Sequence, residues 1–496
     1  MKSLLIFIVY TILIALGLYH HEMWRDELQA WNIVLKSNSI FDLFYNIRYE
    51  GHPVLWFLII WPFSKFTSSP YLIQIIHFCF SVLSAYLIVF KSPLSTLEKI
   101  AVLFSYFLFF EYALISRNYI IGVFLMLCIA YCWKNYRLNI LPIGILLFLL
   151  FQCSAFMTLI AAAILLILII RLYFDHAVFL VKNIAAICLG LAGGILFLYT
   201  TFPQADSSYA TIWNLHFWPG LFISVMAKMN MGLLPVPIFK TAFWETRIIQ
   251  NDIINGIIGI TIWLALLWIW RKNIIIFVFL LSSFGLIALF LYLKPLGGMR
   301  HYGHLSLALI FVYWISYYDN YQPQKVKFLF RSIFLLQVCI GLFAAFEDWN
   351  HPFSNAKNVA AFIKKKLPAD VQIAGAYNNL STAIAGYLGK DIYFLNDGRY
   401  SNYVIWREKY WNEAIRNLSE KELLTRYVST FDIQKSNVLI MSYTGDYSSD
   451  SSRFREGESK LINLGSNIYK VTCLKVFGDA IAADENYFLY SISFSE

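Results

Sequence analysis

The chain has 496 residues, of which 59% are hydrophobic and only 14% are charged. Because soluble domains carry close to a quarter charged residues, this composition excludes an ordinary soluble protein and predicts that much of the chain lies in lipid. The net charge of +9 does not indicate nucleic-acid binding, because many Lys and Arg residues stand in short gaps between apolar runs, where they set membrane orientation.

Eleven apolar runs are predicted to cross the membrane as helices. The first, about 3–19, has bulky charged residues after it instead of a small-residue cleavage site, so we interpret it as an uncleaved span rather than a signal peptide. A further apolar segment, 54–66, is too short to span and contains Pro62, and we expect it to lie at the outer interface. The later spans are predicted at about 70–90, 100–115, 119–133, 139–154, 156–171, 183–201, 253–270, 274–293, 303–319 and 329–346.

The basic residues between these runs indicate the orientation. If Met1 lies in the cytoplasm and 54–66 does not span, every cytoplasmic loop contains Lys or Arg, as the positive-inside rule expects. If 54–66 spanned instead, all later loops would invert and this agreement would be lost. The odd number of spans places the C-terminal region outside. The sequence therefore predicts a transmembrane domain over 1–347 and an extracytoplasmic domain over 348–496.

The C-terminal region alternates predicted helices and strands, which is typical of a layered α/β domain. It has neither a G-x-G-x-x-G sequence nor a P-loop, so it carries no nucleotide-binding signature. The predicted fold is a polytopic α-helical membrane protein of about eleven spans with a soluble C-terminal α/β domain. In this domain, helices are predicted at 355–366, 380–388 and 420–430, strands at 371–376, 392–394 and 438–442, and a Ser-rich loop at 443–452.

Polar residues that could carry chemistry gather in the segments predicted to lie outside. Asp26 and Glu27 directly follow the first span; such a pair can form the first turn of a helix, where the helix dipole favours it, or a catalytic site. His52 and Pro53 open the interfacial helix. Two further outer motifs are Ser116-Arg117-Asn118-Tyr119 and Gly297-Gly298-Met299-Arg300-His301-Tyr302-Gly303.

The order and common outer placement of these motifs resemble the GT-C glycosyltransferases over roughly residues 1–350. The nearest resemblance is to the protein O-mannosyltransferases, the lipid A aminoarabinose transferases and their bacterial relatives, many of which have His-Pro-Pro where this chain has His52-Pro53-Val54. The resemblance implies a GT-C-type fold and a bacterial inner (plasma) membrane location. It also implies an inverting reaction in which a sugar moves from a polyprenyl phosphate to an acceptor hydroxyl or amine.

The same resemblance assigns roles to single residues. Asp26 is the base that takes the proton of the acceptor, which a carboxylate within hydrogen-bond reach can do. Glu27 orients the acceptor or tunes Asp26. Arg300 and His301 bind the departing phosphate with help from Lys294, because the paired N–H groups of Arg match phosphate oxygens. Alternatively, Arg300 and Lys294 are interfacial side chains that reach from the bilayer toward water.

Arg117 is a further candidate for phosphate binding, and the remaining candidates belong to the substrate cavity. Glu111, a costly charge in a predicted span, is either a site residue or the buried partner of Arg117. Relatives often carry a carboxylate in this second outer turn, sometimes bound to a metal, and 116–119 has none. Whether the reaction requires a divalent metal therefore stays open, and no other cofactor is predicted. The cavity candidates are His52, which otherwise caps its helix, Glu50, Glu111 and Tyr302.

The predicted partners are a polyprenyl-phosphate-linked sugar, membrane lipids and an acceptor that the sequence leaves undetermined among protein, lipid and polysaccharide. The aromatic-rich segment 202–252 could close over the lipid-linked sugar, and it could equally form a pair of interfacial helices; the two interpretations are compatible. Two other functions stay open. A lipid-linked-sugar flippase would favour ionisable residues through the middle of the membrane, whereas a non-catalytic envelope assembly protein would not need Asp26.

Overall fold

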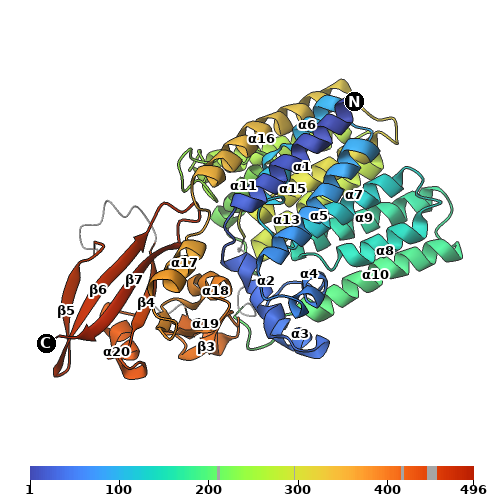
Figure 1. Cartoon of the computed structure of the whole chain (residues 1–496). Helices are drawn as coiled ribbons and strands as arrows, with labels where there is room; N and C mark the ends of the chain where they lie inside the picture. Colours follow the sequence, from blue (N-terminus) through green and yellow to red (C-terminus); the bar gives the residue numbers. More distant parts are fainter. Residues whose placement is uncertain (209–212, 295–296, 415–417, 444–454, 496) are drawn as a thin grey trace.

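A bundle of apolar helices and a C-terminal sheet domain make up the molecule, and the sheet domain lies beside one end of the bundle (Figure 1). The computed structural model describes residues 1–208, 213–294, 297–414, 418–443 and 455–495. It is mostly helical, at 61%. The N-terminus lies at the end of the bundle away from the sheet domain (Figure 1).

Seven of the eleven predicted spans form helices that are long and apolar enough to cross a membrane. At a rise of about 1.5 Å per residue, helices of about 20 residues match the thickness of the hydrocarbon core. The helical character of these predicted spans is confirmed. They are α1 (Lys2–His20), α5 with its π-helical continuation η2 (Tyr71–Lys91), α9 (Ala155–Phe174), α10 (Val181–Thr201), α12 (Asp252–Trp270), α13 (Ile274–Leu293) and α16 (Gln324–Asn350).

The other four predicted spans are shorter helices or broken ones. The run 100–115 is split between α6 (Thr96–Leu103) and a π-helical turn, η3 (Tyr106–Glu111). The remaining three are α7 (Tyr119–Trp133), α8 (Ile140–Leu150) and α15 (His304–Ser316). Every residue of α15 is buried, so its apolar sequence reflects packing inside the bundle. Hydropathy does not separate a helix buried in protein from one buried in lipid, and a total of eleven spans stays a prediction.

Short elements gather at the end of the bundle nearest the sheet domain. They include α2 (Arg25–Lys36), α3 (Ile40–Ile47) and α4 (Leu55–Ile60), which lie together in Figure 1. The segment 54–66 forms α4 and a 3-10 helix, η1 (Pro62–Lys65), which begins at the proline. The described part of 202–252 contains one helix, α11 (Pro219–Leu233), in place of the alternative of a helix pair. Near it lies the four-residue helix α14 (Met299–Tyr302).

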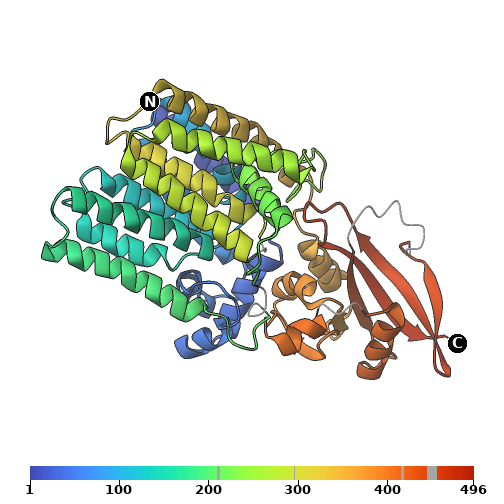
Figure 2. The same ribbon diagram turned by 180° about the vertical axis from the view of Figure 1, so that it is seen from behind.

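The C-terminal sheet has seven strands in the order β3-β2-β1-β4-β7-β6-β5. Strand β1 pairs in parallel with β2 and β4, and the other pairs are antiparallel. β5 and β6 lie on the side of the sheet away from the helix bundle (Figures 1 and 2). The strands are β1 (Gln372–Gly375), β2 (Ile392–Phe394), β3 (Arg399–Ser401), β4 (Asn437–Tyr443), β5 (Ser459–Leu464), β6 (Asn467–Phe477) and β7 (Asn486–Phe494).

Helices cover both faces of this sheet. Alternate residues of its strands point to opposite faces and belong to two separate hydrophobic cores. α17 (Ala356–Lys366) and α18 (Asn378–Leu388) pack on one face. The same core includes Met23, which precedes α2, and Leu28 in its first turns. α20 (Glu420–Thr430) packs on the other face. The sheet domain is therefore fixed to the helix that carries Asp26.

The predicted C-terminal elements are all found, with ends shifted by at most about two residues. Sequence reasoning missed β3, α19 (Glu408–Ala414) and the antiparallel strands β5 to β7. Apart from Tyr443, the loop predicted at 443–452 lies outside the described residues.

Candidate functional site

A cavity of about 750 Å³ lies where the sheet domain meets the end of the helix bundle. Its walls come from α2, the segment 50–57, the turn at 117–118, the ends of α9, α10 and α13, the α14 turn and the sheet domain. Seven of the ten predicted site residues line it: Asp26, Glu50, His52, Arg117, Lys294, Arg300 and His301. The other three, Glu27, Glu111 and Tyr302, do not.

Asp26 lies in the first turn of α2 and faces two arginines from distant parts of the chain. Its Oδ2 atom forms an ion pair with Arg117 and lies 3.2 Å from Nη2 of Arg300. Its side chain is 26% exposed, and this exposed part faces the cavity. Burial alone would raise the pKa of Asp26, but the two guanidinium groups lower it below its usual range. Asp26 is therefore an ionised carboxylate held by two cations.

Arg300 is held by contacts to its guanidinium group and to its main chain. Its Nη1 donates to Oε1 of Glu245 at 2.9 Å, and its guanidinium lies 5.2 Å from the ring of Trp24 and 5.7 Å from that of Trp244. The hydroxyl of Tyr112 donates to its main-chain carbonyl at 2.7 Å. Burial would lower the pKa of Arg300, but the charges of Asp26 and Glu245 raise it. A permanent cation with a fixed orientation therefore stands at the cavity wall.

Glu245 is a site residue that sequence reasoning missed. Its φ is +61°, a left-handed conformation that residues other than glycine seldom adopt and that is often found at functional sites. The carboxylate lies so close to Gly298 that a Cβ atom there would stand 1.9 Å from Oε1. Glycine at 298 therefore allows Glu245 to reach Arg300. The sequence signal was weak: one acidic residue beside Trp244 in a long aromatic loop.

The two cavity histidines are neutral. Nδ1 of His301 accepts the N–H of Gly298 at 2.9 Å, so its proton is on Nε2, which faces the Tyr119 hydroxyl at 3.0 Å. Burial and the charge of Arg300 lower the pKa of His301 well below its usual value. Nε2 of His52 lies 3.4 Å from Arg117, and burial and that charge lower the pKa of His52 to about 3. In the cavity as it stands, the positive charge therefore comes from the arginines and not from these two histidines.

Glu50 is one of three carboxyl groups that line the cavity, with Asp26 and Glu245, and its state differs from that of Asp26. Its Oε1 accepts a hydrogen bond from Nε2 of Gln29 at 2.8 Å. Burial raises the pKa of Glu50 to about 8, and the charge of Asp26 adds to the rise. At neutral pH, Glu50 is therefore mostly the protonated acid. Two carboxyl groups whose pKa values are shifted in opposite directions in one cavity are typical of sites that transfer protons.

Glu27 is buried and turned away from the cavity. Its carboxylate accepts from the N–H groups of Ser116 at 2.6 Å and Trp24 at 3.0 Å, and it lies 3.2 Å from Nε2 of His21. The other ring nitrogen of His21 lies 3.0 Å from Asp348 at the end of α16. Burial alone would lower the pKa of His21, but the two carboxylates raise it well above its usual value. Glu27 therefore holds α2 against the turn that begins at Ser116 and positions Asp26.

Two predicted cavity residues have structural partners instead. Glu111 accepts from the Tyr106 hydroxyl at 2.9 Å and from Nε1 of Trp244 at 3.1 Å. The alternative of a Glu111–Arg117 pair is wrong, because Arg117 forms its ion pair with Asp26 instead. The hydroxyl of Tyr302 donates to the carbonyl of Gly297 at 2.7 Å and closes the α14 turn.

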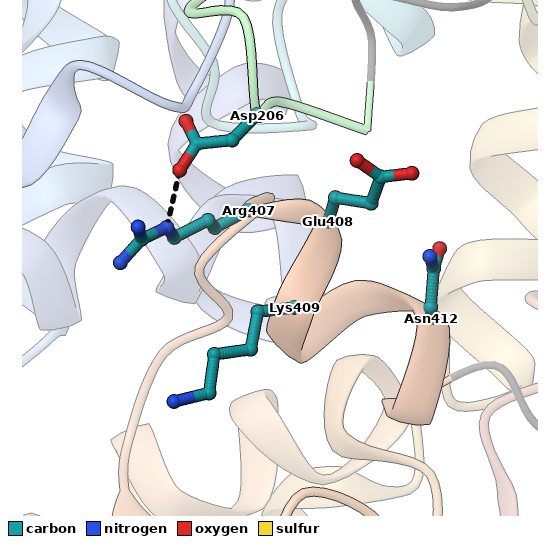
Figure 3. A pocket seen from close by; sticks show the side chains of 5 residues that line it. All are labelled: Asp206, Arg407, Glu408, Lys409 and Asn412. Carbon is teal, nitrogen blue, oxygen red and sulfur yellow. Dashed lines mark hydrogen bonds and ion pairs between the residues drawn. The ribbon is translucent and has the colours of Figure 1, made fainter.

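A second pocket of about 480 Å³ lies near the first and is shown in Figure 3. It is lined by Asp206, Arg407, Glu408, Lys409 and Asn412. Asp206 and Arg407 form an ion pair of 2.5 Å, and both side chains are more than 40% exposed. Because such exposed pairs are solvated and weak, we assign the candidate site to the larger and more buried cavity.

Within the described ranges, no group of three or more His, Cys, Asp or Glu side chains is arranged to hold a metal ion. The arginines of the larger cavity are suited to an anion. Comparisons of the chain with protein-family models, curated proteins and solved structures find no match.

Proposed function

We propose that this protein is an inverting glycosyltransferase that moves a sugar from a polyprenyl phosphate to an acceptor at the outer face of a bacterial inner membrane. The observation that carries the proposal is the meeting of Asp26, Arg117 and Arg300 in one cavity at the end of an apolar helix bundle. These residues come from three of the motifs that resemble GT-C glycosyltransferases. In this proposal Asp26 is the base and the arginines bind the donor phosphate.

The arginines support a phosphate site through their shape and charge. Each guanidinium can offer paired N–H groups to phosphate oxygens, and the partly dry cavity strengthens the attraction. Lys294 adds a cation to the same wall. A bound phosphate competes with Asp26 for Arg117 and Arg300. It also offsets their charge, so the pKa of Asp26 rises toward its ordinary value and the carboxylate becomes a stronger base. Donor binding thereby activates the base.

An apolar wall beside these arginines supports a lipid-linked donor. It contains Phe197, Leu198 and Phe202 at the end of α10, and Phe290 of α13. Leu198 and Phe202 are 61% and 72% exposed, so the wall continues onto the outside of the bundle. α10 lies at one edge of the bundle and α16 at the opposite edge (Figure 1). An isoprenoid chain in the bilayer can therefore lie along α10 while its phosphate reaches the arginines.

The proposed reaction needs one proton transfer. The acceptor hydroxyl or amine attacks the anomeric carbon, and its proton passes to the Asp26 carboxylate. The new bond to carbon forms as the bond from that carbon to the phosphate oxygen breaks, which inverts the anomeric centre. The electron pair leaves with the polyprenyl phosphate, whose charge Arg117 and Arg300 stabilise. Because phosphate is a good leaving group, no general acid is needed.

A reconstituted assay tests this function. The full-length protein in lipid nanodiscs receives polyprenyl phosphates that carry radiolabelled hexose, N-acetylhexosamine or aminopentose, together with cell-envelope extract. We expect one donor to release polyprenyl phosphate and to transfer its label to the extract. Absence of cleavage with every donor contradicts the proposal. In sealed vesicles, movement of an intact donor across the bilayer without cleavage would indicate a flippase instead.

Glu50 predicts how donor use depends on pH. Above its pKa of about 8, Glu50 ionises and adds negative charge to the cavity that binds the phosphate. We therefore expect kcat/KM for the donor to fall above that pH. In Glu50→Gln the amide resembles the neutral acid, so activity at pH 7 should stay close to wild type and this alkaline fall should disappear. The same fall in both proteins would show that another group titrates.

A further inference from the structure

The sheet domain supplies an aromatic wall to the cavity, and the proposed function gives this wall no role so far. It consists of Trp406, Trp411 of α19 and Asn379 of α18. The two indole rings lie with their centroids 4.4 Å apart and their planes at 48°. Both rings are partly exposed, and they line the cavity. We call Trp406 and Trp411 the indole platform.

The segment that follows α10 fixes the position of this platform. The carbonyl of Trp406 accepts from the N–H of Ser208 at 3.0 Å and from its hydroxyl at 3.1 Å. Next to it, the Asp206 carboxylate pairs with Arg407 (Figure 3) and accepts from the Tyr49 hydroxyl at 3.0 Å. The N–H of Glu408 donates to the carbonyl of Asp206 at 2.7 Å. Several contacts thus hold the short stretch 406–408 against the segment after α10, although each exposed contact adds little stability.

The platform is connected to the proposed base through two side chains. The Trp406 side chain hydrogen-bonds Glu50, and Glu50 accepts from Gln29 at 2.8 Å. Gln29 lies on α2, three residues after Asp26, and therefore on the same face of the helix. A molecule that rests on the indoles therefore shares the cavity with Asp26 and lies beside Glu50.

We propose that the indole platform binds a sugar ring of the acceptor, so that the acceptor is a saccharide; this inference rests on the proposed transferase function. The C–H face of a pyranose is apolar and packs on an indole ring, while its hydroxyl groups need polar partners at the ring edge. Asn379 and Glu50 supply such partners in the same lining. The acceptor hydroxyl that attacks the donor then belongs to the sugar on the platform or to the next one.

The composition of the cavity wall favours a saccharide over an extended peptide. Peptides that bind in extended form usually add to the edge of a sheet, where main-chain groups provide the hydrogen bonds. The described residues that line this cavity belong to helices and loops, and none belongs to a strand. Side chains, and mainly two indoles, therefore provide the recognition.

Direct binding tests the platform separately from catalysis. Saturation-transfer NMR of the full-length protein uses trisaccharides of glucose, mannose, galactose and N-acetylglucosamine, with a Ser- and Thr-containing peptide for comparison. We expect at least one trisaccharide to bind through its C–H protons. Trp406→Ala and Trp411→Ala should each weaken that binding by about tenfold, while Trp406→Phe keeps a ring and most of the affinity. If no trisaccharide binds, or if the alanine variants bind as the wild type does, the inference is wrong.

A transfer assay then separates the two proposals. In the wild type, cleavage of the donor with transfer to water reports the transferase function without any acceptor. Trp406→Ala and Trp411→Ala should raise KM for the trisaccharide by a larger factor than they change the rate of this cleavage. The control is Tyr400→Ala, which removes an exposed ring of the same domain outside the cavity and should change neither. Saccharide binding without donor cleavage would reject the transferase function and leave the saccharide site standing. Transfer of label to the peptide instead of the saccharide would reject the saccharide site and leave the transferase function standing.

Discussion

Replacement of Asp26 by Asn is expected to lower sugar transfer by about 10³-fold, with protein level and membrane insertion near wild type. Asn has the shape of Asp and can still accept hydrogen bonds from Arg117 and Arg300, but it cannot take the proton of the acceptor. The measurement is label transfer by purified protein, compared at equal protein concentration and with the melting temperature recorded. Normal transfer by Asp26→Asn would reject Asp26 as the base.

The neighbouring carboxylate provides a matched control. Glu27→Gln changes the same chemistry one residue further on, at a fully buried position where Glu27 faces His21 and two main-chain N–H groups. Removing one member of a buried charged group typically costs about 3–5 kcal/mol. We therefore expect Glu27→Gln to lower the melting temperature and the yield of protein, whereas Asp26→Asn lowers activity alone. Identical effects of the two substitutions would mean that Asp26 also acts through the fold.

The sequence located the apolar helices well, because a long apolar run bounded by basic residues is typical of a helix that is buried in lipid or protein. It did not resolve which helices are long enough to span. α15 is as apolar as a span, yet it has 13 residues and all of them are buried in protein. The run 100–115 does not form one continuous α-helix, because a π-helical turn interrupts it. This run contains no glycine or proline from which that turn could be predicted. The local composition of a segment indicates that it is buried, whereas the length of the helix it forms depends on the elements packed against it.

The candidate site was predictable where its residues belong to short polar motifs between apolar runs. Asp26, Arg117 and Arg300 stand in three such motifs, and the fold brings them within contact distance. Trp406 and Trp411 were missed, because they reach the cavity only through the docking of the sheet domain on α2. Antiparallel strands β5 to β7 were missed as well. Such long-range packing leaves no signal in the spacing of neighbouring residues.

Arg300→Ala is expected to lower kcat/KM for the donor by about 10²- to 10³-fold, the typical effect of removing one group that stabilises developing negative charge. KM for the acceptor should change little. The guanidinium contacts the Asp26 and Glu245 carboxylates and the Trp24 and Trp244 rings, and no such contact joins it to the indole platform. The assay varies donor and acceptor separately at constant ionic strength.

Two further variants separate charge from geometry at this position. Arg300→Lys keeps the charge but loses the paired N–H groups, so its donor kcat/KM should fall between those of wild type and Arg300→Ala. Glu245→Gln keeps Arg300 and weakens the contact that orients it, so a smaller loss of donor use is expected. Arg271→Ala, at an exposed arginine outside the cavity lining, is the control for removal of a positive charge. Equal losses for donor and acceptor in Arg300→Ala would contradict a phosphate site, because a guanidinium bound to the leaving group has no reason to alter acceptor affinity.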